Sequence, residues 1–407
     1  MIKRKLFLSS SIILIVSAFL LLGYSLISSI GSEELISFFL ILILLCGFLF
    51  FFSLEKEQPV PKTILFLIFF GFILRSYYAY TLYTSMFSPF PDSFRYISNL
   101  KDLVTVGNLD FYTMESVTGT SQFFYYYLLY FAKYIFETNF SLYLVNIFLF
   151  SLSALLFYRI IYSEFGKRIS YVSTILVILS ANFLLFTSNI LKDSLVLFLM
   201  ILIFHIYKFG NKKHILLITL LIGCLILTRI YAGFSVLAAI SFDVIFNRIH
   251  FKNVLNKVIS TLFLIAVVVI VFNFTFLSNY LTLSQEFLSN QSLLGSILTI
   301  PYGLINMFFA PFPWGVFSGE KTTYSYVQID SGFALLFSFT LLMFAYKFIK
   351  FKSLRKKMYL YLIPIIIHAL ALGIAYEGGS TRQRIGVYCF IILIFVVGLF
   401  YKPNKNK

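Results

Sequence analysis

Charged residues are scarce in this chain: they make up 12% of its 407 residues, whereas 60% are hydrophobic. Soluble globular domains carry about twice that share of charge, so the composition excludes an ordinary soluble fold. Cysteine and histidine are also rare, with three and four copies. Because Cys46, Cys224 and Cys389 all lie inside apolar stretches, neither a disulfide framework nor a thiolate metal cluster is expected, and packing is their expected role.

Apolar stretches of about 14 to 25 residues recur along the whole chain, which is typical of a bundle of membrane-spanning helices. We predict an all-α polytopic membrane protein with about 12 transmembrane helices, in which residues 1–407 form a single membrane domain. The first stretch lacks a small-residue cleavage site, so we expect it to remain as a helix. The predicted spans cover about residues 6–30, 35–54, 62–83, 140–161, 169–190, 193–209, 214–228, 230–246, 257–277, 332–350, 357–375 and 385–401.

Lysine and arginine predict how these spans are oriented. They cluster at residues 3–5, 167–168, 208–214, 247–257, 347–357 and 402–407. Clusters of this kind favour the cytoplasmic side of a membrane, so both termini are predicted to be cytoplasmic. The formal net charge of +16 then reflects membrane orientation, and nucleic acid is not an expected partner.

Two further apolar stretches are not predicted to cross the membrane. A crossing at 121–136 would move most of the later basic clusters to the outside, and its dense tyrosines with Lys133 suit the membrane interface. The stretch 296–315 contains three prolines, which fit an interfacial or re-entrant segment. Two large extracytoplasmic segments with interfacial helices result, at about residues 84–139 and 278–331.

Eight ionisable residues near the predicted outer ends of helices are candidates for a functional site. They are Arg75, Asp92, Arg95, Lys192, Asp193, Arg229, Arg382 and Arg384. A charge at membrane depth costs about 2.5 to 3.5 kcal/mol by insertion scales unless it is solvated or paired. The basic members also oppose the general bias of basic residues toward the cytoplasm. We treat Asp92 as the catalytic candidate and the other seven as candidates for substrate binding.

Arg229 lies at the turn between two predicted helices of about 15 residues each, in "LILTRIYAGF". Such helices rise only about 22 Å, which is less than the roughly 30 Å of a bilayer core. The turn is therefore expected to be recessed below the outer surface, where a guanidinium is well shaped to hold a lipid-linked phosphate or pyrophosphate. The alternatives are contact with lipid headgroups and an ion pair with Asp193.

Lys192 and Asp193 stand where a predicted helix begins at the outer face, in "SNILKDSLVLF". Asp193 suits a helix cap as well as a catalytic site, because its carboxylate can accept a backbone N–H. Lys192 suits phosphate binding as well as simple neutralisation of the loop. Both readings of each residue stay open at this point.

Asp92 follows Pro91 in "SPFPDSFRY" and precedes a predicted helix. This position suits a turn or a helix cap. The alternative is a general base that takes the proton from a sugar hydroxyl while cations hold a departing phosphate. Arg95, three residues on, is expected to pair with Asp92 or to contact phosphate.

The remaining polar residues carry weaker signals. Arg382 and Arg384 precede the last predicted span in "STRQR", where phosphate binding and headgroup contact are both open. Glu320 and Asp330 are expected to be solvated residues of the second outer segment, with metal ligation as the alternative. Metal ligands remain unknown, although Asp92 and Asp193 could share a divalent cation.

Four stretches resemble, in this order, the GT-C superfamily of polytopic glycosyltransferases: "PFPDSFRY", "LKDSLVLFLMILIFHIYK", "LILTRIYAGFSVLAAI" and "TRQRIGVYCFIILI". The resemblance covers roughly residues 85–240 and the last span. It implies Asp92 as catalytic base, Asp193 as a second acidic residue and Arg229 as a ligand of the donor phosphate. Ile230 stands where the family commonly has proline, and the first large outer loop follows the third predicted span instead of the first.

The leading hypothesis is an integral-membrane glycosyltransferase of bacterial surface-polysaccharide assembly. It would act at the extracytoplasmic face of the cytoplasmic (inner) membrane, moving a glycosyl unit from a polyprenyl-phosphate or polyprenyl-pyrophosphate donor to a glycan or lipid-linked glycan acceptor. One base suffices for an inverting transfer, and a lipid-linked donor requires no nucleotide-binding loop.

Two alternatives are kept. The chain also resembles O-antigen and capsule repeat-unit polymerases in its length, its number of predicted spans and its two sizeable outer loops. A lipid-linked oligosaccharide flippase is the second alternative. The two long outer segments and the lack of an internal repeat disfavour the flippase.

Overall fold

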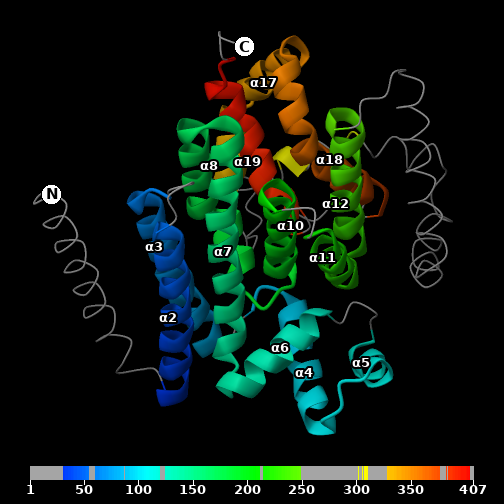
Figure 1. The fold of residues 1–407 in the computed structure, drawn as a ribbon. Coiled ribbons are helices and arrows are strands. Elements are labelled where there is room, and N and C mark those ends of the chain that lie inside the picture. Colours follow the sequence, from blue (N-terminus) through cyan, green and yellow to red (C-terminus); the bar gives the residue numbers. More distant parts are fainter. Residues whose placement is uncertain are drawn as a thin grey trace, which may run out of the picture.

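The structure is a computed structural model, and it describes residues 31–54, 60–86, 88–119, 124–210, 214–248, 301, 305, 307–309, 328–375, 382 and 384–403. These residues form helices and no strand (Figure 1), so the predicted all-α class is confirmed for them. The expected spans 6–30 and 257–277 lie outside the described residues. So do Glu320 and most of the expected outer segment 278–331.

The helices follow one another with short connections. The N-terminal half contains α2 (Ser32–Leu54), α3 (Lys62–Thr84), α4 (Pro91–Val106), α5 (Phe111–Thr118), α6 (Phe124–Phe136), α7 (Phe140–Phe165), α8 (Lys167–Leu179), α9 (Ala181–Thr187) and α10 (Asp193–Phe209). The remainder contains α11 (Ile215–Thr228), α12 (Ile230–Asp243), η2 (Val244–Arg248), α16 (Gln328–Leu336), α17 (Phe339–Lys350), α18 (Lys352–Ala375) and α19 (Ile385–Phe400).

Three of the described helices, α2, α3 and α7, are long and apolar enough to cross a membrane. The number rises to five if α8 with α9, and α16 with α17, each form one bent span. The helices α11, α12 and α19 are apolar but shorter. A membrane protein is therefore indicated, and the figure of about 12 spans remains a prediction.

Two expected spans are broken by bends. Helices α8 and α9 meet at an angle of 54°, and α16 and α17 meet at 57°. At the first bend the Ser180 hydroxyl accepts a hydrogen bond from the backbone N–H of Phe183 at 3.2 Å, which is the preferred role of serine at a helix start. The expectation of a continuous helix is therefore wrong at 169–190 and at 332–350. Helix α16 also begins inside the expected outer segment, at Gln328.

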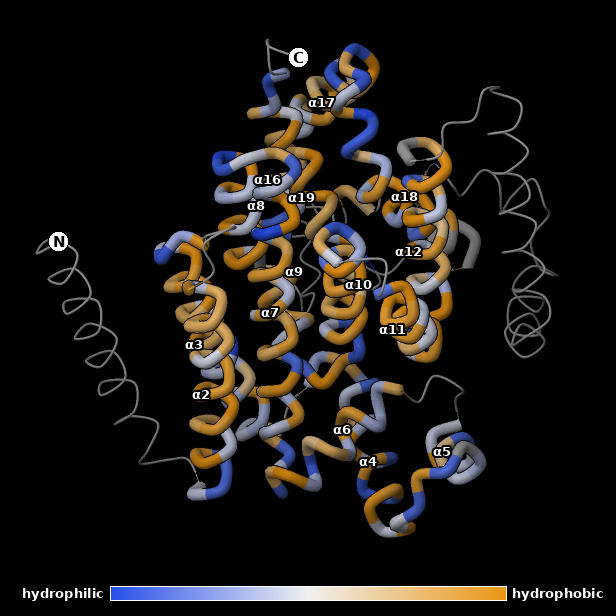
Figure 2. Tube along the Cα trace, in the orientation of Figure 1, coloured by the Kyte–Doolittle hydropathy of each residue, from blue (hydrophilic) through white to orange (hydrophobic). Residues whose placement is uncertain are grey.

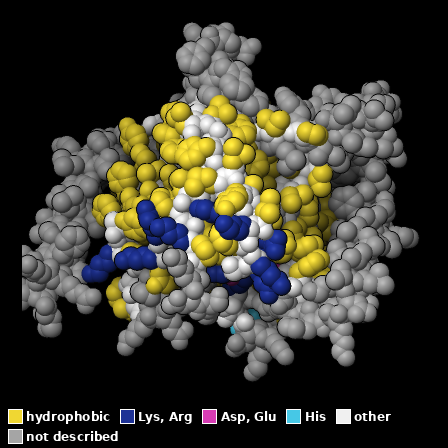
Figure 3. Space-filling view, turned by 90° about the horizontal axis from the view of Figure 1, so that it is seen from above, with side chains coloured by type: hydrophobic (Ala, Val, Ile, Leu, Met, Phe, Trp, Pro, Cys, Tyr) yellow, Lys and Arg dark blue, Asp and Glu magenta, His cyan; other side chains and the backbone are white. Residues whose placement is uncertain are grey.

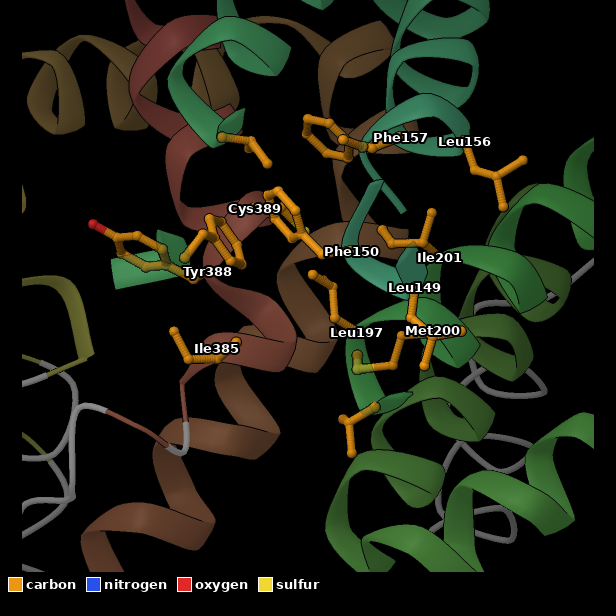
Figure 4. Close-up of a cluster of buried hydrophobic side chains, with 14 of the residues drawn as sticks. Leu149, Phe150, Leu156, Phe157, Leu197, Met200, Ile201, Ile385, Tyr388 and Cys389 are labelled. Carbon is orange, nitrogen blue, oxygen red and sulfur yellow. The ribbon is translucent and has the colours of Figure 1, made fainter. Parts of the chain in front are cut away.

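Helix α7 is central to the bundle and packs against α2, α3, α8 and α10. Figure 4 shows apolar side chains of α7, α10 and α19 pointing toward one another, among them Phe150, Phe157, Leu197, Ile201 and Cys389. All five are buried. Close van der Waals packing of this kind holds helices together in a membrane, where lipid tails are as apolar as the side chains.

The two ends of the bundle differ in charge. Basic side chains gather on the end near the C-terminus (Figure 3), and their contacts tie neighbouring helix ends together. The Arg168 guanidinium lies 4.2 Å from the ring centroid of Phe400, while Lys208 and Lys357 both contact Glu164 at the end of α7. Helices α4, α5 and α6 lie at the opposite end (Figure 1), and polar and apolar residues mix along them (Figure 2).

The tyrosine-rich stretch predicted at 121–136 contains α6. This helix buries Tyr125, Tyr126 and Leu129 against the protein and leaves Tyr134 and Ile135 exposed. It is therefore two-sided, as an interfacial helix requires. Its position relative to a membrane remains a prediction.

Candidate functional site

Asp193 is the first residue of α10 and is fully buried, with both carboxylate oxygens paired to arginines. Its Oδ2 accepts a hydrogen bond from Arg382 Nε at 2.8 Å. Its Oδ1 lies 2.7 Å from Arg229 Nη1, an ion pair whose angles are not those of a hydrogen bond. The N-cap position of α10 belongs to Lys192. The expected capping role of Asp193 is therefore wrong, because its carboxylate joins two distant parts of the chain instead.

Arg229 is held in place by the junction of α11 and α12. It is the single residue between these two helices and has an extended backbone, with φ −158° and ψ 104°. The helices turn back on each other so closely that a Cβ on Gly233 would lie 2.3 Å from the Ile226 side chain. The guanidinium is nearly buried, with its Cζ 5.5 Å from the Tyr231 ring centroid. Of the alternatives for Arg229, the ion pair with Asp193 is therefore confirmed.

Arg382 connects this buried pair to Asp92. Its Nη1 contacts Asp92 Oδ2, while its Nε is bonded to Asp193. The N-cap position of α4 belongs to Phe90, and Asp92 lies in the first turn. The expected capping role of Asp92 is therefore wrong, because its carboxylate pairs with a residue ahead of the last helix.

Two contacts fix the first turn of α4 beside the loop that precedes α10. The Ser93 hydroxyl donates a hydrogen bond to the carbonyl oxygen of Ile190 at 3.3 Å. The Phe90 ring stacks on Phe186 with centroids 5.2 Å apart. The backbone of Asp92 is thus anchored next to Lys192 and Asp193.

Lys192 adds a third cation. Its ammonium lies within electrostatic range of Asp92, Asp193, Arg229 and Arg382. Burial, with further contributions from the two arginines, lowers the pKa of Lys192 to about 7. With Lys192 protonated, three cations and two carboxylates leave a net charge of +1 in this group of five residues. We call these five residues the charged cluster.

Tyr96 is a further neighbour of the charged cluster that the sequence analysis missed. Its ring meets Tyr125 edge-on, with centroids 5.0 Å apart. Its phenol interacts electrostatically with Arg382, Asp193 and Asp92, and burial raises the pKa of Tyr96 above its usual range, so the phenol remains a neutral donor. The signal was its position four residues after Asp92, which places both on one face of a helix.

A buried amide supports the cluster from behind. The side-chain nitrogen of Asn146 donates to the Tyr125 hydroxyl at 2.9 Å and to the carbonyl oxygen of Asn189 at 2.6 Å. These bonds connect the middle of the bundle to the loop before α10. The sequence signal was an amide inside the otherwise apolar run of α7, since buried polar groups in such runs need partners.

Three of the eight sequence candidates lie outside the charged cluster. Arg95 donates to the Thr118 carbonyl oxygen at 3.1 Å, so it holds the end of α5 and does not pair with Asp92 as expected. Arg384 donates to Met307 O and to Asn182 Oδ1, at 3.1 and 3.2 Å. Both guanidiniums thus have protein partners of their own.

Arg75, the third, supports the bend between α8 and α9. Its Nη2 donates to the Ile178 carbonyl oxygen at 2.8 Å, and its Nε donates to Thr187 Oγ1 at 3.3 Å. Its Cζ lies 4.2 Å from the Phe150 ring centroid. A helix end leaves carbonyl oxygens unpaired, and Arg75 satisfies one of them at this break.

Asp330 also serves the bend and is not the solvated loop residue that was expected. Its carboxylate accepts hydrogen bonds from the backbone N–H groups of Ala181 and Asn182, at 3.1 and 2.9 Å, and from the Ser180 hydroxyl. A carboxylate at a helix start satisfies unpaired donors and suits the helix dipole. Asp330 therefore joins α16 to the start of α9.

Within the described residues, His, Cys, Asp and Glu side chains form no group of three or more that could hold a metal ion. Asp92 and Asp193 have the Arg382 guanidinium between them. A divalent cation shared by these two carboxylates therefore gains no support from their arrangement.

Three comparisons with known proteins bear on the chain. No protein-family model matches it, and no curated protein and no solved structure matches it either. The resemblance to GT-C glycosyltransferases therefore remains a prediction.

Proposed function

We propose that this protein is an integral-membrane glycosyltransferase of bacterial surface-polysaccharide assembly. It transfers a glycosyl unit from a polyprenyl-phosphate or polyprenyl-pyrophosphate donor to a glycan or lipid-linked glycan acceptor. One observation carries the proposal: a half-exposed carboxylate, Asp92, lies beside three cations at one end of an apolar helical bundle. The carboxylate is suited to accept a proton, and the cations are suited to hold a phosphate.

The distribution of charge supports an extracytoplasmic site. Basic side chains gather at the end of the bundle opposite α4, α5 and α6 (Figures 1 and 3), and basic residues favour the cytoplasmic side. The first turn of α4 carries Asp92. On this assignment the charged cluster faces the outside of the cytoplasmic membrane, and both termini are cytoplasmic.

The lengths of two helices support a lipid-linked donor. Helices α11 and α12 have 14 residues each, so they rise only about 21 Å, against about 30 Å for a bilayer core. If both helices begin near the inner surface, Arg229 at their junction lies below the outer surface. A donor anchored by a polyprenyl chain would bring its phosphate to that depth.

Each charged residue then has a role in an inverting transfer. Asp92 takes the proton of the acceptor hydroxyl as that oxygen bonds to the anomeric carbon. The bond between the anomeric carbon and the donor phosphate oxygen breaks, and its electron pair stays on the phosphate. Arg382, Arg229 and Lys192 stabilise the charge that develops there. Asp193 keeps Arg229 and Arg382 in position.

Analysis of surface glycans from a deletion strain tests this function. Complementation with Asp92→Asn should leave the glycan as defective as in the deletion strain, at normal membrane expression, because the amide cannot accept the proton. Asp102→Asn, which removes the same charge from the exposed end of the same helix, should restore normal glycan. Normal glycan with Asp92→Asn would refute the proposed base.

The defect of the deletion strain identifies the type of transfer. Long chains that lack one sugar indicate a single-sugar transferase. Single repeat units on the surface indicate a repeat-unit polymerase, and intermediates trapped on the cytoplasmic side indicate a flippase. The last outcome would refute glycosyl transfer.

A further inference from the structure

The two carboxylates bonded to Arg382 differ sharply in exposure. The side chain of Asp193 is 0% exposed and that of Asp92 is 50% exposed, while that of Arg382 is 17% exposed. A buried charge left without its partner is strongly unfavourable, whereas an exposed ion pair contributes little to stability. The bond from Arg382 to Asp193 is therefore permanent, and the bond to Asp92 is the one that can exchange.

Exchange requires only a rotation of the Asp92 side chain. The backbone of the first turn of α4 is anchored through Ser93 and Phe90, so the helix itself can stay in place. The half-exposed carboxylate can turn from Arg382 into water, where it is solvated. The Nη1 group of Arg382 would then be open to another anion.

We propose that Asp92 occupies the phosphate position on Arg382 in the ligand-free protein, and that the pyrophosphate group of a lipid-linked ligand displaces it. This inference rests on the proposed function for its consequence: the base is released from its ion pair only when a donor is bound. Asp92 is then both the internal competitor of the ligand and the group that the ligand sets free.

The charges favour pyrophosphate over a single phosphate. When the Asp92 carboxylate leaves Arg382, three cations and the Asp193 carboxylate remain around the vacated position, a net charge of +2. A pyrophosphate diester carries two negative charges and a phosphate diester carries one. The pyrophosphate therefore neutralises the position, whereas the phosphate diester leaves one positive charge uncompensated.

Binding of inorganic pyrophosphate to the purified full-length protein in detergent tests the exchange. Calorimetric titration without divalent cations should show that Asp92→Asn binds pyrophosphate tighter than wild type, by about fivefold, because the competing ion pair is gone. Asp102→Asn should bind like wild type. Equal or weaker binding by Asp92→Asn, or no measurable binding by either protein, would overturn the proposal.

Salt separates contact competition from repulsion through solvent. The screening length falls from about 8 Å at 0.15 M salt to about 3 Å at 1 M. The ratio of the Asp92→Asn and wild-type affinities should persist at the higher salt if Asp92 competes by contact. A ratio that falls to one would assign the effect to long-range repulsion and refute displacement.

Two arginine variants locate the position. Arg382→Gln should lose pyrophosphate binding, whereas Arg95→Gln, which changes an exposed arginine on the same helix as Asp92, should keep it. Because Arg382→Gln also removes a partner of buried Asp193, Asp92→Asn remains the decisive variant. Retained binding in a folded Arg382→Gln protein would contradict the assignment.

The binding result is independent of the glycan result. Tighter pyrophosphate binding by Asp92→Asn together with normal glycan would uphold the displacement and refute the base. Unchanged binding together with a glycan defect would uphold the base and refute the displacement.

Discussion

Asp193 and Arg229 form a buried ion pair, with 2.7 Å between Oδ1 and Nη1, at the first residue of α10 and the junction of α11 and α12. The pair fixes the angle at which three helices meet at one end of the bundle. Because Arg382 bonds to the other carboxylate oxygen, the same aspartate also locates the segment that precedes α19. The charged cluster is thus organised around Asp193.

Asp193→Asn is expected to destabilise the protein strongly. The substitution leaves two nearly buried guanidiniums without their carboxylate, and breaking a buried pair costs about 3 to 5 kcal/mol. Thermal unfolding of the detergent-solubilised protein should show a much lower Tm than for wild type, with Asp102→Asn as the charge-matched control. An unchanged Tm would mean that the cluster does not hold these helices together.

Arg75→Met is expected to lower stability without changing the affinity for pyrophosphate. It leaves the Ile178 carbonyl oxygen without its donor at the bend between α8 and α9, and a buried unsatisfied acceptor costs about 1 to 3 kcal/mol. Tm and calorimetric titration on the same preparation check both parts. A large loss of pyrophosphate affinity in a well-folded variant would return Arg75 to the binding site.

Anion binding is expected to weaken as the pH rises from 6 to 8. The pKa of Lys192 is lowered to about 7 by burial, so the residue carries its charge below that pH and loses it above. Sulfate is a suitable ligand, because its own charge does not change in this range. Sulfate affinity of wild type should fall with rising pH, whereas Lys192→Arg, which stays charged, should show little change. Equal pH profiles for the two proteins would exclude Lys192 as the source.

The proposed orientation predicts which side of the membrane two surface residues face. Tyr112 on α5 is 82% exposed, and Lys356 near the start of α18 is exposed at the basic end. A membrane-impermeant maleimide applied to intact cells should label Tyr112→Cys and should not label Lys356→Cys, with wild type as the blank. The reverse pattern would invert the topology and place the charged cluster in the cytoplasm.

The predicted elements were most accurate where the sequence contains a long uniform apolar run. The spans expected at 35–54, 62–83 and 140–161 correspond to α2, α3 and α7 within a few residues. The bend at Ser180 was missed, because the residues on both sides are equally apolar. Its stability depends on Asp330 and Arg75, whose proximity is not encoded in local composition.

The candidate site shows the same division. Asp92, Lys192, Asp193, Arg229 and Arg382 were all selected because ionisable groups at membrane depth need a partner or a function. Their partners were harder to select: Arg95 was expected to pair with Asp92 from three residues away, and Arg382 pairs with it instead. Helical spacing brings two residues to one face, but it does not decide which of them another segment of the chain will approach.

Composition and hydropathy alone determined that this chain forms apolar helices and that its basic residues gather at one end, since both follow from the free energy of placing side chains in lipid or in water. Only the tertiary structure decided that five charged residues from separate segments meet around Asp193, and that Arg75, Arg95 and Arg384 have other partners. Ion pairs and hydrogen bonds act over a few ångströms, so they depend on how helices pack and not on how far apart residues lie in the chain.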